Sequence, residues 1–132
     1  MNRPVIGVGV FVRNGTKVLV HQRKNAHGQD TWGLIGGHME FGETPEQTAA
    51  REAKEEANIA IKNAKVIGIT NDIMHAEQKH YITIFVEAEF VSGDLRTNDP
   101  TYISELQWCE VDKIPEPRFA PLQRFLENKR LL

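Results

Sequence analysis

The chain has 132 residues, one cysteine and a formal net charge of −2 at pH 7, with 40% hydrophobic and 26% charged residues. This length predicts one domain, residues 1–132, with room for a hydrophobic core, and the small net charge excludes a general attraction to nucleic acid polymers or anionic membranes. The lone Cys109 excludes an intrachain disulfide, and no apolar stretch is long enough for a membrane span or a signal peptide, so we expect a cytoplasmic protein.

The first third of the chain predicts a β-hairpin followed by a polar loop. Residues 5–12 are rich in Val, Ile and Phe, Asn14-Gly15 is a hairpin turn signal, and residues 17–22 form the returning strand. Arg23 ends that strand among other basic residues, a pattern that is a solvated edge about as often as a functional group. Trp32 follows the loop and is expected in the core or in a pocket wall.

The next stretch predicts a capped helix over residues 45–57. Thr44 is a good N-cap, Pro45 fits the first helical position, and Gln47 completes a capping box. Asn58 tolerates the left-handed conformation with which helices often end. A stripe of small residues recurs at helical spacing and is expected to face inward: Ala49, Ala50, Ala53 and Ala57.

Three carboxylates crowd one side of this helix. Glu52, Glu55 and Glu56 lie at spacings of three, one and four, so they share one turn and repel each other by a few tenths of a kcal/mol per pair. Taken alone, such a run is more often a solvated helix face, with Arg51 and Glu55 as an ion pair. A hard divalent cation would convert the repulsion into a binding site, because Mg2+ and Mn2+ prefer oxygen ligands.

The loop before the helix favours the metal site. Gly36, Gly37 and Gly42 provide backbone that permits close approach just before a capped helix N-terminus, and Glu43 adds another acid. A glycine-rich turn that leads into a helix with clustered acids suits a metal–phosphate site better than a plain surface helix.

The second half of the chain predicts more strands and a final helix. Residues 65–75 and 81–91 are predicted strands, and the second alternates polar and apolar side chains. A loop over residues 95–104 precedes a short strand over 105–111, and apolar residues at helical spacing predict a helix from about 119 to 129. This order indicates an α+β or three-layer α/β architecture.

The stretch from Gly37 to Ile59 resembles the signature of the Nudix hydrolases, G-x5-E-x7-R-E-U-x-E-E-x-G-U, in which U is apolar. The wider segment GGHMEFGE resembles the MutT-like branch of nucleotide pyrophosphohydrolases. The one departure is Asn58 in place of glycine, a residue that also tolerates the left-handed conformation. The positions that match are Gly37, Glu43, Arg51-Glu52, Ala53, Glu55-Glu56 and Ile59.

The resemblance implies a Nudix-type three-layer α/β/α sandwich with a curved mixed sheet, and hydrolysis that depends on Mg2+, with Mn2+ as a substitute. Arg51 is expected to orient the acids. Glu43 is expected to hold the loop or to support the metal ligands from behind. The general base is expected among the signature acids or on a distant loop. Glu105 is a candidate from such a loop, although an ordinary exposed acid is the slightly favoured alternative there. The implied metal ligands are Glu52, Glu55, Glu56 and the Gly37 carbonyl.

The substrate is where the sequence is least informative. Arg23 is the candidate for binding phosphate, and His38 for touching the phosphates or the sugar. No set of side-chain donors would enforce one base, so we expect modest selectivity. The other candidates for the pocket wall are Val8, Val10, Trp32, Leu34, His80, Tyr81 and Thr83.

We therefore expect a small-molecule nucleotide substrate with a phosphoanhydride, with (d)NTP hydrolysis to (d)NMP and pyrophosphate as the leading reaction. ADP-ribose and dinucleoside polyphosphates are alternative substrates, which are weakened because no Pro or Tyr stands near residues 75–77. The downstream array of aromatic and proline residues that is specific for NADH is also missing. The alternative of another class is a Nudix-fold module that binds a nucleotide without cleaving it. The sequence leaves the oligomeric state open, with a homodimer as one option.

Overall fold

The computed structural model describes residues 3–128. These residues form a seven-stranded sheet with two α-helices and a short 3-10 helix, and neither described α-helix is long and apolar enough to cross a membrane. The elements are β1 (Val5–Asn14), β2 (Lys17–Arg23), β3 (Trp32–Gly33), β4 (Ile35–His38), α1 (Pro45–Ala57), β5 (Ala60–Met74), β6 (Lys79–Ser92), β7 (Ile103–Glu110), η1 (Val111–Lys113) and α2 (Ala120–Asn128).

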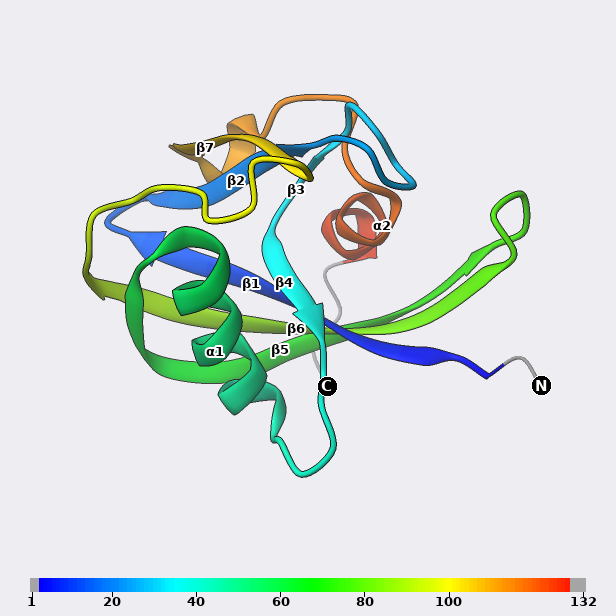
Figure 1. Ribbon diagram of the computed structural model, residues 1–132, viewed down its shortest axis with the longest axis horizontal. Helices are drawn as coiled ribbons and strands as arrows, with labels where there is room; N and C mark the ends of the chain where they lie inside the picture. The colour runs from blue at the N-terminus through cyan, green and yellow to red at the C-terminus, as the bar shows by residue number, and fades with distance from the viewer. Residues whose placement is uncertain (1–2, 129–132) are drawn as a thin grey trace.

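The sheet is mixed and curved (Figure 1). Its main order is β3-β2-β1-β6-β5, and β1 and β6 pair in parallel, whereas the other pairs are antiparallel. β4 pairs with the first half of β1, β2 pairs with its end, and β7 pairs with β2. This arrangement confirms the expected curved mixed sheet.

One helix covers each face of the sheet. Side chains along β1 alternate between these two faces. Val10 and Val12 point to one face and pack in a core with the Ala residues of α1. Phe11 points to the other face and packs against Phe85 and Phe125, the last on α2. The three layers agree with the expected α/β/α sandwich.

The helix α1 has the predicted bounds and caps. The Thr44 Oγ1 accepts a hydrogen bond from the Gln47 backbone N–H, and the Gln47 side chain accepts one from the Thr44 N–H. Asn58 ends the helix in the left-handed conformation with φ 60°. Ala50 is exposed, so the buried stripe consists only of Ala49, Ala53 and Ala57.

Other elements differ from the prediction mainly at their ends. β5 begins at Ala60 rather than at residue 65, and β5 and β6 form a long hairpin that extends beyond the helices (Figure 1). β7 starts at Ile103 within the predicted loop because its backbone pairs with β2, which no local pattern reveals. α2 is described to Asn128, and its predicted end at 129 lies outside the described residues.

Candidate active site

The acids of α1 meet the two glycines of β4. The Glu56 Oε1 accepts a 2.8 Å hydrogen bond from the Gly36 backbone N–H. A Cβ on Gly37 would lie 2.4 Å from the Glu52 Oε1, and a Cβ on Gly36 would lie 1.9 Å from the Val8 carbonyl oxygen. Position 36 therefore requires glycine, because its neighbour is backbone, whereas a side chain at position 37 would displace the Glu52 carboxylate. The close approach brings the Glu52 and Glu56 carboxylates to one short backbone segment.

Arg51 ties the acids to the loop before the helix. Its Nε and Nη2 donate to the two oxygens of Glu43 at 2.7 and 3.0 Å. Its Nη1 donates to Glu52 at 2.8 Å and to Glu55 at 3.3 Å, and its Nη2 also donates to the His38 carbonyl at 3.0 Å. A planar guanidinium can hold several acceptors in a fixed arrangement, so Arg51 sets the orientation of this cluster.

Glu43 is held from several sides. Besides Arg51, the Thr48 hydroxyl and the Glu40 backbone N–H donate to its Oε1. The Arg51 hydrogen bonds lower the pKa of Glu43 to about 2, with further lowering from the Glu40 N–H. These contacts suit a carboxylate that fixes the loop to the helix.

Glu56 has the opposite environment. Burial, together with the neighbouring Glu52 and Asp99 charges, raises its pKa to about 8, against the Gly36 N–H and the Arg23 charge, which lower it. Burial likewise raises the pKa of Glu52, although its contacts with Arg51 oppose the shift. Among residues 3–128 Glu56 forms no ion pair. Glu56 is partly buried, accepts one hydrogen bond and forms no ion pair in this range, so it is short of positive charge.

The donor set fits a hard divalent cation. The Glu52 and Glu56 carboxylates and the backbone at Gly37 offer only oxygen atoms, which Mg2+ and Mn2+ prefer. Within the described residues, no three acidic, His or Cys side chains already gather as a metal cage. Arg51 contacts Glu52 and Glu55 in this arrangement, so ligation by Glu55 requires its exposed side chain to turn away from Arg51.

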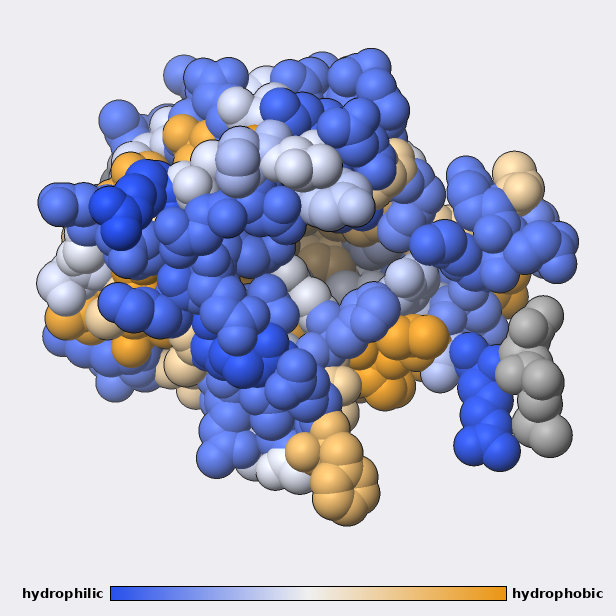
Figure 2. Space-filling view, viewed as in Figure 1, coloured by the Kyte–Doolittle hydropathy of each residue, from blue (hydrophilic) through white to orange (hydrophobic). Residues whose placement is uncertain are grey.

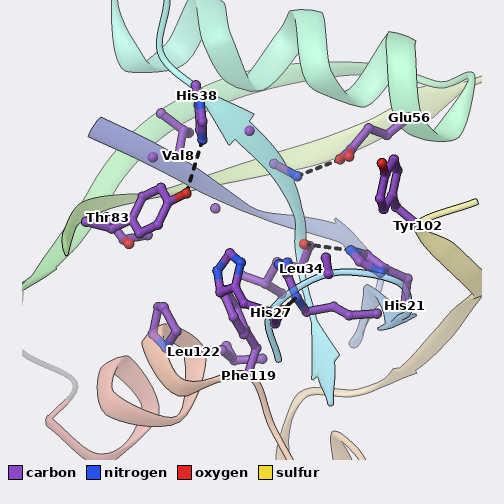
Figure 3. A pocket seen from close by; sticks show the side chains of 18 of the residues that line it. Val8, His21, His27, Leu34, His38, Glu56, Thr83, Tyr102, Phe119 and Leu122 are labelled. Carbon is purple, nitrogen blue, oxygen red and sulfur yellow. Dashed lines mark hydrogen bonds between the residues drawn. The ribbon is translucent and has the colours of Figure 1, made fainter. Parts of the chain in front are cut away.

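A cavity of about 570 Å3 opens beside these acids, and Glu56, Gly36, Gly37 and His38 line its edge. Figure 2 shows the hollow at the centre of the viewed face, and Figure 3 shows its wall. His27 stacks on Tyr81 with ring centroids 5.9 Å apart, and Phe119 lies beside His27. The wall thus offers flat aromatic surface next to a cluster of acids.

The structure brings two of the four predicted substrate-binding residues to this cavity. Arg23 lines it, with its guanidinium over the Phe119 ring and its Nε donating to the His27 carbonyl. His38 lines it beside the Tyr81 hydroxyl. Trp32 does not line it and instead packs against the core that includes Phe11 and α2. That role agrees with the core alternative for Trp32.

His80 also lies away from this cavity. Its ring contacts Asn71 and borders a separate hollow near the β5–β6 hairpin, because the register pairs His80 with Ile73 close to the hairpin end. Among the other candidates, Val8, Leu34, Tyr81 and Thr83 line the cavity. Val10 does not line the cavity, because it is fully buried in the core that includes the Ala residues of α1.

Glu105 is exposed on β7, pairs in register with Gln22, and does not line the cavity. Asp99 is the acid that the preceding loop brings there, and its charge acts on Glu56. The loop is fixed to the end of α1, since the Asn98 backbone N–H donates to the Glu56 carbonyl and its side chain to the Glu55 carbonyl. The sequence predicted a loop here but gave no sign that it docks on α1.

His21 is a second cavity residue that the sequence did not single out. It is 4% exposed, and burial lowers its pKa to about 4, so the ring is neutral near pH 7. Its Nε2 lies 3.1 Å from the Leu34 carbonyl oxygen, which can only accept, so Nε2 carries the proton. A single His on a buried strand carries no local pattern that would distinguish it from a core residue.

Comparisons with known proteins agree with this geometry. The NUDIX domain family matches residues 3–128. A solved structure of a MutT NUDIX hydrolase from Burkholderia pseudomallei is 28% identical, with a TM-score of 0.88, over 96% of this chain and 98% of that one. A MutT protein from Methanosarcina mazei has a TM-score of 0.78 at 24% identity, over 98% of this chain and 95% of that one, which shows the fold.

Curated relatives carry several different activities in their names. A putative 8-oxo-dGTP diphosphatase 3 of Mycobacterium tuberculosis is 36% identical over 78% of this chain and 50% of its own length. An ADP-ribose pyrophosphatase of Methanocaldococcus jannaschii is 27% identical over 88% and 68%. An NAD-capped RNA hydrolase of Pectobacterium atrosepticum is 29% identical over 93% and 46%, so the chain spans about half the length of several of these relatives.

The family match covers almost all of the described chain, and the acids, Arg51 and glycines of the signature meet at one site. The chain therefore belongs to the Nudix family of hydrolases.

Proposed function

We propose that this protein hydrolyses a phosphoanhydride of nucleoside triphosphates with Mg2+, giving the monophosphate and pyrophosphate. The observation that carries the proposal is the position of Glu56, a partly buried carboxylate that forms no ion pair among residues 3–128, at the edge of an aromatic-walled cavity. The acids suit the metal–phosphate end of such a substrate, and the aromatic wall suits its base. A cytoplasmic location and a small-molecule substrate belong to the same proposal.

The metal, when bound, would neutralise phosphate charge and lower the pKa of a water molecule. In this proposal Glu52, Glu56 and the Gly37 carbonyl hold it, and Mn2+ can replace Mg2+. Arg51 keeps Glu52 oriented through its 2.8 Å hydrogen bond, and Glu43 anchors Arg51 to the loop. Glu55 is the remaining signature acid and serves as a further ligand once it leaves Arg51.

Two groups on the cavity wall complete the proposed chemistry. Arg23 supplies fixed donors for a phosphate, because its guanidinium is held over Phe119. Asp99 replaces Glu105 as the loop acid that accepts a proton from the attacking water, since it lines the cavity beside Glu56.

A second substrate class has specific support in the comparisons. This chain matches 68% of the length of the ADP-ribose pyrophosphatase. ADP-ribose also contains a diphosphate next to a nucleoside. We retain ADP-ribose and dinucleoside polyphosphates as the runner-up class. A nucleotide-binding module without activity is disfavoured by the complete acidic set.

The deciding experiment is a panel of dNTPs, NTPs, ADP-ribose, dinucleoside polyphosphates and NADH at equal concentration, with Mg2+ and with chelator. We expect metal-dependent pyrophosphate release from several triphosphates, within about two orders of magnitude of one another. Turnover confined to ADP-ribose or dinucleoside polyphosphates would refute the triphosphate proposal, and nucleotide binding without any turnover would favour the inactive module.

A further inference from the structure

A buried polar cluster lies behind the cavity wall, away from the acids of α1. Asp72 on β5 is 1% exposed. Its Oδ2 lies 2.7 Å from the Thr70 hydroxyl and 2.8 Å from the Thr83 hydroxyl, and its Oδ1 pairs with Arg124 of α2. Every oxygen of this buried carboxylate therefore has a partner.

This cluster fixes the polarity of Thr83. An Asp72 carboxylate that is paired with an arginine has no proton to give, so both threonine hydroxyls must donate to it. A hydroxyl has one proton and two lone pairs. Thr83 directs its only proton at Asp72, and it can present only lone pairs to any other group.

The Thr83 side chain lies on the wall of the cavity. Thr83 lines it together with Gly7, its register partner on β1. A Cβ on Gly7 would lie 4.0 Å from the Thr83 Oγ1 and 3.6 Å from the Tyr81 ring, so the glycine leaves space in front of both. In Figure 3 Thr83 and Glu56 lie on opposite sides of the cavity, which places Thr83 away from the metal end.

We propose that Thr83 is a specificity-determining residue that accepts a hydrogen bond from the base of the nucleotide, and that it favours bases with an exocyclic amino group over bases with a carbonyl or a bare C–H there. The inference rests on the proposed function, because it requires that a nucleotide base enters this cavity. Asp72 is the positioning residue, since it acts only through Thr83.

The physical basis is the mismatch that a wrong base creates. A base amino group can donate to Thr83, whereas a base carbonyl would bring two acceptors together. Thr83 is only 8% exposed, and a polar group left without a partner against a buried side chain is rejected more strongly than a missing methylene group. Stacking on the aromatic wall formed by His27 and Tyr81 does not require a hydrogen-bond donor on the base, so the hydroxyl rather than the stacking distinguishes an amino group from a carbonyl.

Binding of three purine monophosphates tests the inference without any turnover. dIMP lacks the 2-amino group of dGMP and has a carbonyl in place of the 6-amino group of dAMP. We expect NMR titrations in chelator to give a Kd for dIMP about tenfold or more above that of the tighter of dAMP and dGMP. Thr83→Val should reduce this ratio to within about threefold, and Thr83→Ser should retain it.

Thr70→Val is the matched control. It removes the other hydroxyl from the same Asp72 oxygen, but Thr70 does not line the cavity, so the dIMP ratio should remain. Equal binding of the three nucleotides by the wild type, no binding of any of them, or an unchanged ratio in Thr83→Val would overturn the inference. Such a result alongside intact pyrophosphate release leaves the proposed function standing, whereas a base preference without triphosphate turnover refutes only the proposed reaction.

Discussion

Glu56, which is partly buried, and Asp72, which is 1% exposed, are two carboxylates in the same small domain, and their surroundings differ. Both oxygens of Asp72 have partners, namely two hydroxyls and Arg124. Glu56 accepts one hydrogen bond, from Gly36, and the Glu52 and Asp99 charges face it. A buried acid that the fold has compensated serves structure, and one left short of positive charge indicates a place for an external cation.

The largest expected effect is the loss of turnover on substitution of Glu56, the acid that forms no ion pair within the described residues. Glu56→Gln removes one ligand charge with little change in volume, and it should lower turnover by about two to three orders of magnitude while leaving the fold intact. Pyrophosphate release at saturating Mg2+ and the thermal midpoint measure the two effects. Glu52→Gln should behave similarly, and a near wild-type rate in either variant would show that the ligand assignment is wrong.

Breaking the ion pair between Asp72 and Arg124 should give the reverse pattern, a loss of stability that exceeds the loss of activity. Arg124→Leu leaves Asp72 buried without its cation and should lower the free energy of unfolding by about 2–3 kcal/mol, below the value for a fully buried pair because Arg124 is partly exposed. Denaturant titration gives the stability, and kinetics at a temperature where the variant is folded should show a smaller loss than Glu56→Gln. A stable but inactive variant would reverse the two roles.

Substitution of Arg51 tests whether Arg51 and the acids around it are more than a surface ion pair. Lys cannot reproduce the fork that joins Glu43, Glu52 and the His38 carbonyl, so Arg51→Lys should lower turnover about tenfold or more with a smaller relative loss of stability. Melting and kinetics must be measured on the same preparation. Proportional losses of both would favour a purely structural ion pair.

The smallest expected effect is the pH dependence of the metal-free protein. Because the pKa of Glu56 is raised to about 8 in the folded state, its protonated form stabilises the fold, and stability should fall as pH rises from about 5 to 8 and level off above that. The slope from this group is at most about 1.4 kcal/mol per pH unit. Thermal melts in chelator should show the decline in the wild type and a weaker one in Glu56→Gln; equal slopes would contradict the raised pKa.

The sequence by itself determined α1 and most of its chemistry. Caps and glycine turns act over a few residues, so Thr44, Gln47 and Asn58 specified both ends of the helix. The i,i+4 spacing placed Glu52 and Glu56 on one turn because helical geometry is local. The family resemblance supplied the expected sandwich, which the two helices on opposite faces of the sheet confirm.

Tertiary structure decided what these residues face. Whether Asp99 or Glu105 meets Glu56 depends on a loop in which Asn98 donates to backbone carbonyls of α1, and such backbone acceptors leave no side-chain pattern in the sequence. The separation of Trp32 and His80 from the cavity, and the inclusion of His21, follow from strand register. The polarity of Thr83 likewise arises from Asp72 and Arg124, 11 and 41 positions away along the chain, because only packing brings those three side chains together.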